Sequence, residues 1–260
     1  MTLRKKRGRT RPAAWRRHRV TKVDPQLGRL TAPAQAISST TPDTVATEMT
    51  LEDHSIVQVL ERLVPETVVA GGSFAGALPH PRSLQSAARS AVFASAQEIA
   101  TEECIRCLLR RAGLPLDLRV EKREDGTREW PRGLVGSLTH KGTVVLGVIG
   151  TSATVKMIGL DLERNDQSDL LPIEPLVAPE GLPLGTDRQF GTLLAFSAKE
   201  AVFKAQYPAT RERLDFSAVR LRWTGNRDEG FRAVVDCLVP GLEVRTALVG
   251  KWLLACAIAL

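Results

Sequence analysis

The segment Ile158-Gly-Leu-Asp-Leu-Glu163 alternates apolar and acidic residues, and this pattern constrains the fold more than any other feature of the chain. In a strand, residues two apart point to the same face, so Asp161 and Glu163 project together while the leucines between them face a core. Two neighbouring carboxylates repel unless a cation or a proton lies between them, and such oxygen ligands suit Mg²⁺. The alternative is a strand end in solvent, with Glu163 paired to Arg164.

A second segment, Phe196-Ser-Ala-Lys-Glu200-Ala-Val-Phe-Lys204, predicts a helix that begins at Ser197 and runs to Tyr207. Glu200 and Lys204 are four residues apart and therefore lie on one face. The spacing leaves two interpretations open. In the first, Ser197 and Glu200 form a capping box and Lys204 completes a common surface pair. In the second, Glu200 is a metal ligand or general base and Lys204 neutralises a phosphate.

A third segment, Gly136-Ser-Leu-Thr-His140, precedes Lys141-Gly142. We expect a glycine-flanked turn here, whose hydroxyl, imidazole and backbone N–H groups suit a phosphate. A lone histidine is more often structural, but His140 is the only one of the four histidines in such a setting.

The net charge of +7 belongs to one end of the chain. The first 22 of the 260 residues contain ten Lys or Arg and no acidic residue, which leaves a formal charge of −3 for the rest. We expect residues 1–50 to be a disordered basic extension, or translation to begin at Met49, and we do not expect nucleic acid as a partner. No apolar stretch approaches the roughly 20 residues of a membrane span, so we expect no membrane association.

The cysteine pattern favours a reduced, cytoplasmic protein. Cys104 and Cys107 form a C-x-x-C pair, but they lie in an amphipathic helical pattern that ends at Gly113. Cys237 and Cys256 are isolated, and no histidine is close to either pair in the sequence. Core cysteines therefore explain the pattern better than a metal site.

Periodicity and turn residues predict an α+β fold. We expect helices over 56–64 and 86–111, separated by Gly71-Gly72 and a proline-rich stretch. Strands 143–149 and 155–162 are predicted to form a hairpin, and a loop is expected over 171–185. The other predicted strands cover 116–122, 218–223, 231–238, 242–249 and 251–260.

Taken in order with Trp130-Pro-Arg-Gly133, the three segments resemble the motifs of the 4'-phosphopantetheinyl transferases, in particular the enterobactin-synthetase-activating branch of the surfactin type. The resemblance covers about residues 55 to 260. It implies two similar α+β halves, residues 51–153 and 154–260, with the active site at their junction.

The resemblance also implies an activity, in which a monomer transfers phosphopantetheine from coenzyme A to a serine of an apo acyl or peptidyl carrier protein and releases 3',5'-ADP. By this analogy Asp161, Glu163 and Glu200 hold Mg²⁺. Glu200 also deprotonates the serine, and Lys204 stabilises or protonates the leaving phosphate. Carriers of siderophore, peptide, polyketide or fatty acid synthesis are the implied partners.

The implied contacts to coenzyme A are Thr139 and His140 together with basic residues elsewhere. In the stretch that is arginine-rich in the family, Cys104 and Arg106 match, but Ser95 and Glu102 replace arginines, and a carboxylate repels a phosphate. Either other basic residues compensate or affinity for coenzyme A is low. The candidates are Arg89, Arg106, Arg132 and Lys141, of which we assign Arg106 and Arg132 to the coenzyme.

The alternative is a degenerate, non-catalytic relative that binds a carrier or, through the basic arm, nucleic acid. The four residues Asp161, Glu163, Glu200 and Lys204 are all present, which favours the enzyme.

Overall fold

A computed structural model describes residues 51–74, 86–166, 171–177, 182–183, 186–226, 230–236 and 239–260. The predicted basic extension, residues 1–50, lies outside them. The helices are α1 (Leu51–Leu63), α2 (Ser86–Arg111), α3 (Glu174–Val177) and α4 (Arg188–Thr210), with short 3₁₀ helices η3 (Leu171–Ile173) and η4 (Phe216–Ala218). The strands are β1 (Val68–Phe74), β2 (Glu121–Lys122), β3 (Arg128–Glu129), β4 (Leu134–Lys141), β5 (Val144–Thr151), β6 (Met157–Arg164), β7 (Arg220–Asn226), β8 (Gly230–Asp236), β9 (Glu243–Val249) and β10 (Trp252–Ala259).

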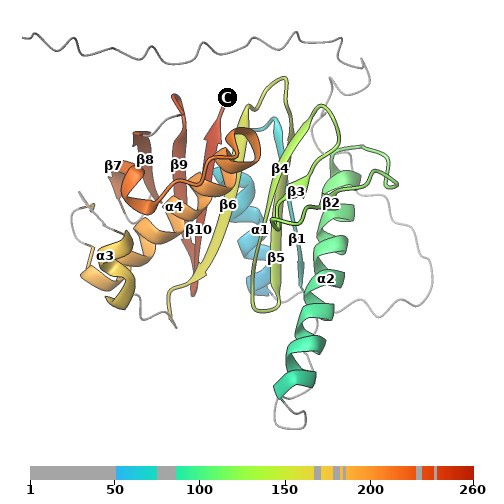
Figure 1. Cartoon of the computed structure of the whole chain (residues 1–260), viewed down its shortest axis with the longest axis horizontal. Coiled ribbons are helices and arrows are strands. Elements are labelled where there is room, and N and C mark those ends of the chain that lie inside the picture. The colour runs from blue at the N-terminus through green and yellow to red at the C-terminus, as the bar shows by residue number, and fades with distance from the viewer. Residues whose placement is uncertain are drawn as a thin grey trace, which may run out of the picture.

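Two antiparallel sheets stand side by side, and they confirm the predicted α+β class (Figure 1). The first has the order β1-β5-β4 and the second the order β6-β10-β9-β8-β7, while β2 and β3 form a separate small hairpin. All strands of the first sheet precede residue 153, and all strands of the second follow residue 154. That residues 51–153 and 154–260 are two similar halves stays a prediction.

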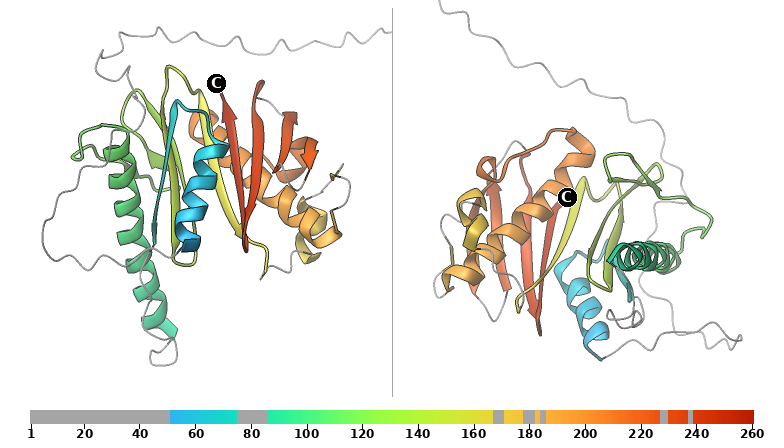
Figure 2. Two further views of the ribbon diagram at one scale, coloured as in Figure 1. Left: turned by 180° about the vertical axis from the view of Figure 1, so that it is seen from behind. Right: turned by 60° about the horizontal axis from the view of Figure 1, so that its bottom comes forward.

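The helices cover the sheets from different sides. Helix α2 packs on β1 and β5, and α4 packs along β6 and β10. Helix α1 contacts β1 and β9, and Figure 2 shows it on the opposite face of the second sheet from α4. The three long helices α1, α2 and α4 therefore each bury one face against a sheet, as layered packing requires.

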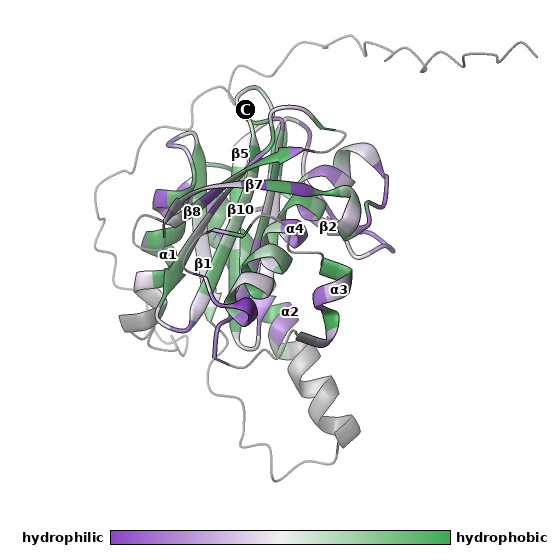
Figure 3. Cartoon of the chain, turned by 90° about the vertical axis from the view of Figure 1, so that its left-hand side faces the viewer, coloured by the Kyte–Doolittle hydropathy of each residue, from purple (hydrophilic) through white to green (hydrophobic). Residues whose placement is uncertain are grey.

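A single apolar cluster joins the two sheets under α1. It contains Leu60 of α1, Leu146 of β5, Leu160 of β6 and Leu254 of β10. All eight residues of β5 and all eight of β10 are buried, which places these two strands at the centre of the molecule. Both are green in Figure 3, as hydrophobic strands are. The predicted C-terminal strand is thus confirmed over 252–259.

The predicted hairpin between the strands around 143–149 and 155–162 is wrong. Strand β5 pairs with β1 along one edge and with β4 along the other, so no edge remains for β6. Strand β6 pairs instead with β10, where Asp161 lies opposite Ala255. Which strands pair depends on contacts between segments far apart in the chain, and the local sequence does not show them.

Strand β1 was not predicted, because Gly71-Gly72 is typical of a break. Both glycines lie inside the strand, and they are required by close packing. A Cβ atom on Gly72 would lie 2.9 Å from a Leu146 methyl group and 3.2 Å from the Val145 carbonyl oxygen. The glycines let the strand approach its neighbours.

Other predicted boundaries also differ. Only 121–122 of the predicted strand 116–122 pairs as a strand, and the expected loop over 171–185 includes η3 and α3. The predicted turn over 136–140 is strand β4, which pairs residue by residue with β5, so the turn falls at Gly142 instead. The helix predicted over 86–111 has those bounds, and the four C-terminal strands are confirmed to within a few residues.

Helix α4 begins nine residues before the predicted start at Ser197. Asp187 is the N-cap, and its Oδ1 accepts a hydrogen bond from the Phe190 amide at 2.8 Å. The extra turns bury Phe190 and Leu194 in an apolar cluster with Leu253 of β10. The capping box at Ser197 is therefore wrong, since that residue lies in the middle of the helix.

The C-x-x-C pair lies on α2, as predicted. Cys104 and Cys256 are buried free thiols, Cys107 is partly exposed, and Cys237 lies outside the described residues. Burial raises the pKa of the Cys256 thiol to about 12, and it also raises the pKa of Cys104. None of the helices that the structure describes has the length and apolar character needed to span a membrane.

Candidate active site

The three sequence segments meet at one cleft of about 810 Å³. Its walls come from α2, the β2–β3 hairpin, β4, β6 and α4. A hydrogen bond beside the cleft ties the two sheets together, since the Leu160 amide on β6 donates to Ser137 Oγ on β4 at 3.0 Å. The serine of the predicted phosphate-binding segment thus joins the sheets.

The two carboxylates of β6 line this cleft, on the same face as predicted. Asp161 is 4% exposed and Glu163 is 8% exposed, whereas Leu160 and Leu162 between and beside them belong to the core. The alternative of a solvent-exposed strand end is therefore wrong. Arg164 donates two hydrogen bonds to Asp166, and Glu163 is bonded to Lys141.

Asp161 receives two hydrogen bonds from α4. Ser197 Oγ donates to its Oδ2 at 2.9 Å, and Lys204 Nζ forms an ion pair with its Oδ1 at 2.5 Å. A buried carboxylate is expensive without such partners. Lys204 thus points into the cleft and bonds across it, which contradicts the alternative of a simple surface pair with Glu200.

Glu163 forms an ion pair with Lys141, the residue at the end of β4. Burial raises the pKa of Glu163 above its usual value, the nearby Asp161 raises it further, and Lys141 and Lys204 oppose the shift. The carboxylate is thus held between a like charge and two ammonium groups.

Glu200 is half-buried on α4 and faces the same group of charges. Burial raises its pKa, Lys204 lowers it, and both Asp161 and Glu163 raise it again. The last two effects place all three carboxylates within electrostatic reach of one another. A carboxyl group with a raised pKa is better suited to accept a proton near neutral pH.

The donor chemistry of this group fits Mg²⁺, which prefers one or two carboxylates and completes its shell with water and phosphate oxygens. The mutual repulsion of Asp161, Glu163 and Glu200 is what a divalent cation would relieve. In the part of the chain that the structure describes, no three acidic, histidine or cysteine side chains lie close enough together to hold a metal ion. Two of these carboxylates are instead bonded to lysines.

Thr139 and His140 of β4 also line the cleft. Thr139 is buried, while His140 remains open to solvent on the cleft side. The pKa of His140 lies below its usual value because the surrounding protein removes part of its hydration, and because Lys204 and Lys122 repel the imidazolium. Both residues are thus placed in the cleft, as the sequence predicted.

Two basic residues assigned to coenzyme A are not in the cleft. Arg106 and Arg132 are solvent-exposed and are absent from its lining, and the side chains of Ser95 and Arg89 are outside the described part of the structure. Lys122 and Arg128 of the β2–β3 hairpin line the cleft instead. Arg128 lies 3.7 Å from Glu102, the carboxylate that stands in place of a family arginine.

We did not predict from the sequence that aromatic side chains line the cleft. Phe196, Phe203 and Tyr207 of α4 line the cleft, as does Trp130, and the rings of Phe203 and Tyr207 stack with centroids 5.0 Å apart. Helical spacing could have predicted this. Phe203 is three residues after Glu200 and Tyr207 is three residues after Lys204, so the two rings lie on the same side of the helix as the charged pair.

Comparison with known proteins identifies the family of the chain. No family model matches the chain. The chain is 30% identical over 197 residues to the 4'-phosphopantetheinyl transferase PptT of Mycobacterium tuberculosis. The matched region covers 68% of this chain and 82% of that protein. The chain is 33% identical over 179 residues to Svp of Streptomyces mobaraensis (63% and 71%), and 30% identical over 195 residues to Npt of Nocardia iowensis (68% and 84%), both likewise named 4'-phosphopantetheinyl transferases. Sequence motifs, cleft and relatives together identify the chain as a member of the 4'-phosphopantetheinyl transferase family.

Proposed function

We propose that this enzyme transfers the 4'-phosphopantetheine group of coenzyme A to a serine hydroxyl of an apo carrier protein and releases 3',5'-ADP. The proposed acceptors are peptidyl or acyl carrier proteins of siderophore, peptide, polyketide or fatty acid synthesis. The observation that carries the proposal is the convergence of Asp161, Glu163, Glu200 and Lys204 on one cleft from two elements.

Glu200 is the proposed general base. Its half-buried carboxylate faces the open cleft and has a raised pKa, so it is placed to accept the proton of the carrier serine directly or through a water molecule. The serine oxygen then forms a bond to the phosphorus that carries pantetheine. The bond from that phosphorus to the bridging oxygen breaks, and the electrons leave with 3',5'-ADP.

Lys204 is the proposed donor to the leaving phosphate. Its ammonium is held in the cleft by Asp161 of β6, the strand on which α4 packs. A cation fixed where negative charge develops lowers the barrier without reorganisation during the reaction. His140, Thr139, Lys122 and Arg128 are the groups placed to bind the nucleotide end of the coenzyme.

Asp161, Glu163 and Glu200 are the residues that would hold Mg²⁺, and a bound ion would supply charge neutralisation for the pyrophosphate of coenzyme A. Support comes from the all-oxygen donor set and from the repulsion among the three groups. Titration of the coenzyme-free protein with Mg²⁺, followed by the fluorescence of the cleft residue Trp130, tests this assignment apart from turnover. A matched titration of Asp161→Asn should show weaker binding.

The test of the reaction is intact mass spectrometry. Apo peptidyl and acyl carriers are mixed with the enzyme, coenzyme A and Mg²⁺, and each serine carrier is compared with its Ser-to-Ala variant. We expect one phosphopantetheine group on the serine carrier, none on the variant, and one equivalent of 3',5'-ADP. A lack of labelling on every carrier would favour the non-catalytic alternative, which predicts carrier binding without turnover or nucleic-acid binding that is lost when residues 1–22 are deleted.

A further inference from the structure

Arg211 is the one residue other than glycine with a positive φ angle in the described ranges, with φ of 60° and ψ of 13°. It is the C-cap of α4, and its amide donates to the Tyr207 carbonyl at 2.9 Å. A residue with a Cβ atom is disfavoured in this conformation, and helices that end this way most often have glycine there. An arginine at this position therefore has a conformational cost that a glycine would not have.

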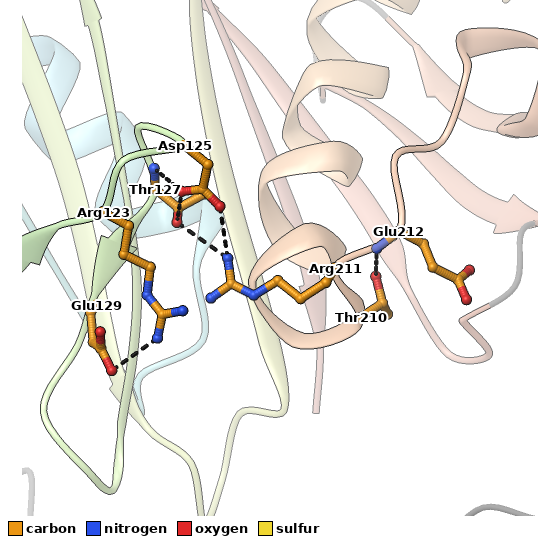
Figure 4. A network of polar contacts seen from close by, with 7 residues as sticks. All are labelled: Arg123, Asp125, Thr127, Glu129, Thr210, Arg211 and Glu212. Carbon is orange, nitrogen blue, oxygen red and sulfur yellow. Dashed lines mark hydrogen bonds and ion pairs between the residues drawn. The ribbon is translucent and has the colours of Figure 1, made fainter.

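The side chain of Arg211 reaches the β2–β3 hairpin, 86 residues earlier in the chain (Figure 4). Its Nη1 lies 3.0 Å from Asp125 Oδ2 and 3.4 Å from Thr127 Oγ1. The guanidinium also lies over the ring of Tyr207, 5.7 Å from its centroid. An exposed ion pair alone contributes little, but here one guanidinium is held by a carboxylate, a hydroxyl and an aromatic face.

Asp125 is itself fixed within the turn. Its Oδ1 accepts hydrogen bonds from the Thr127 amide at 3.0 Å and from Thr127 Oγ1 at 2.6 Å. The base of the hairpin is closed by an ion pair of Arg123 with Glu129 at 2.9 Å. A contact that holds Asp125 in place therefore also restrains the backbone of the turn.

This turn is a wall of the active-site cleft. Asp125, Gly126, Thr127 and Arg128 line the cleft, and so does Tyr207, the ring beneath the guanidinium. Arg211 does not line the cleft, so it contacts the wall from outside. The hairpin has only two residues in each strand, and two-stranded ribbons of this size are not stable alone.

We propose that Arg211 is a positioning residue that fastens the turn Asp125–Arg128 to the end of α4 and thereby sets the affinity of the cleft for coenzyme A. The part that concerns coenzyme A rests on the proposed function. The fastening of the turn does not, because it depends only on contacts within this chain. Loss of the side chain frees the turn, which weakens binding but leaves Glu200 and Lys204 in place.

The variant Arg211→Gly distinguishes positioning of the turn from a role in ending helix α4. Glycine suits the left-handed C-cap, so the variant loses the contacts to the hairpin and keeps the helix end. Hydrogen–deuterium exchange of the coenzyme-free protein should show faster exchange over 122–128, with an unchanged or higher melting temperature. The KM for coenzyme A should rise about fivefold while kcat changes little, as loss of a contact worth about 1 kcal/mol implies.

Arg213→Ala is the matched control, since Arg213 is an exposed arginine two residues further on, and it should leave both exchange and KM unchanged. Arg211→Lys keeps the charge and should restore part of the protection. Asp125→Asn should reproduce the effect of Arg211→Gly, and the double variant should be no worse than either single one.

The proposal is overturned if Arg211→Gly leaves exchange over 122–128 at the wild-type rate, or if it lowers the melting temperature and kcat together, as a merely structural residue would. It is also overturned if the two single effects add in the double variant. Because exchange is measured without coenzyme A or carrier, a wild-type enzyme that fails to label any carrier would refute the proposed function and leave the test of the fastening intact.

Discussion

Lys204 Nζ on α4 bonds to Asp161 Oδ1 on β6 at 2.5 Å, across 43 residues of sequence. This contact joins the helix that carries Glu200 to the strand that carries Glu163. Asp161 is only 4% exposed, and its second oxygen is bonded to Ser197 of the same helix. The proposed catalytic arrangement therefore depends on the packing of α4 on β6.

Asp161→Ala should lower the transfer rate by about 100-fold or more, because a group fixed where charge develops is typically worth that much. The protein should remain folded, with a cost of about 1–3 kcal/mol for the hydrogen-bond partners left unsatisfied. Steady-state rates and urea unfolding measure the two effects. Asp166→Ala, an exposed carboxylate just beyond β6, is the control. A folded Asp161→Ala enzyme with a near-normal rate would remove Asp161 from the site.

Gly159→Ala should damage both stability and activity. A Cβ atom on Gly159 would lie 2.0 Å from the Ala201 carbonyl oxygen and 2.4 Å from the Ala205 amide nitrogen, both backbone atoms of α4. The helix must then move away from β6, at a cost of about 1–3 kcal/mol or more. Gly150→Ala, where the nearest atom is a Val155 methyl group at 3.2 Å, should cost less and leave activity unchanged. Equal effects of the two substitutions would contradict the close packing of α4 on β6.

Lys199→Leu should lower the free energy of unfolding by about 1–3 kcal/mol. Lys199 is buried on α4, and its Nζ donates to the carbonyl oxygens of Val177 and Phe216, each at 2.7 Å. The variant removes this donor from both carbonyl oxygens, although the Phe216 oxygen keeps its hydrogen bond from the Val219 amide at 3.3 Å. Chemical unfolding measures the loss, and Lys122→Leu at an exposed position provides the comparison. The idea fails if Lys199→Leu is as stable as the wild type.

The buried thiols should make the protein less stable at alkaline pH. Burial raises the pKa of Cys256 to about 12 from 9.0, and that of Cys104 also rises. Because the folded-state pKa is the higher one, the stabilisation is complete below pH 9 and is lost as pH rises from 9 toward 12. Each thiol should contribute about 1 kcal/mol per pH unit in this window.

Urea unfolding between pH 8 and pH 11 checks this slope, and Cys256→Ala should make it shallower. Alkylation at pH 8 followed by peptide mapping provides a second readout. Cys107, which is partly exposed, should be modified before Cys104 and Cys256. Rapid modification of Cys256 in the native protein would show that its surroundings are open.

The sequence predicted the parts of this structure that depend on local periodicity. Alternation placed Asp161 and Glu163 on one face, and helical spacing placed Glu200 and Lys204 on another. The prediction failed where contacts with residues far away in the sequence determine the structure. The partners of β5 and β6 are set by strand pairing, and Gly71 and Gly72 lie in a strand because Leu108 and Leu146 pack against them. The hairpin residues Lys122 and Arg128 reach the cleft only through the tertiary fold, whereas the exposed Arg106 and Arg132 do not line it.

The most direct test of the central claim is the labelling rate of an apo carrier by the wild-type enzyme and by Glu200→Gln, measured side by side by intact mass. Glutamine keeps the size of the side chain and removes its ability to accept a proton. We predict one phosphopantetheine group per carrier with the wild type, and a rate at least about 100-fold lower with Glu200→Gln, in the range that general-base catalysis supplies. Equal rates for the two proteins, at equal stability, would contradict the assignment of Glu200 and of this cleft as the site of transfer.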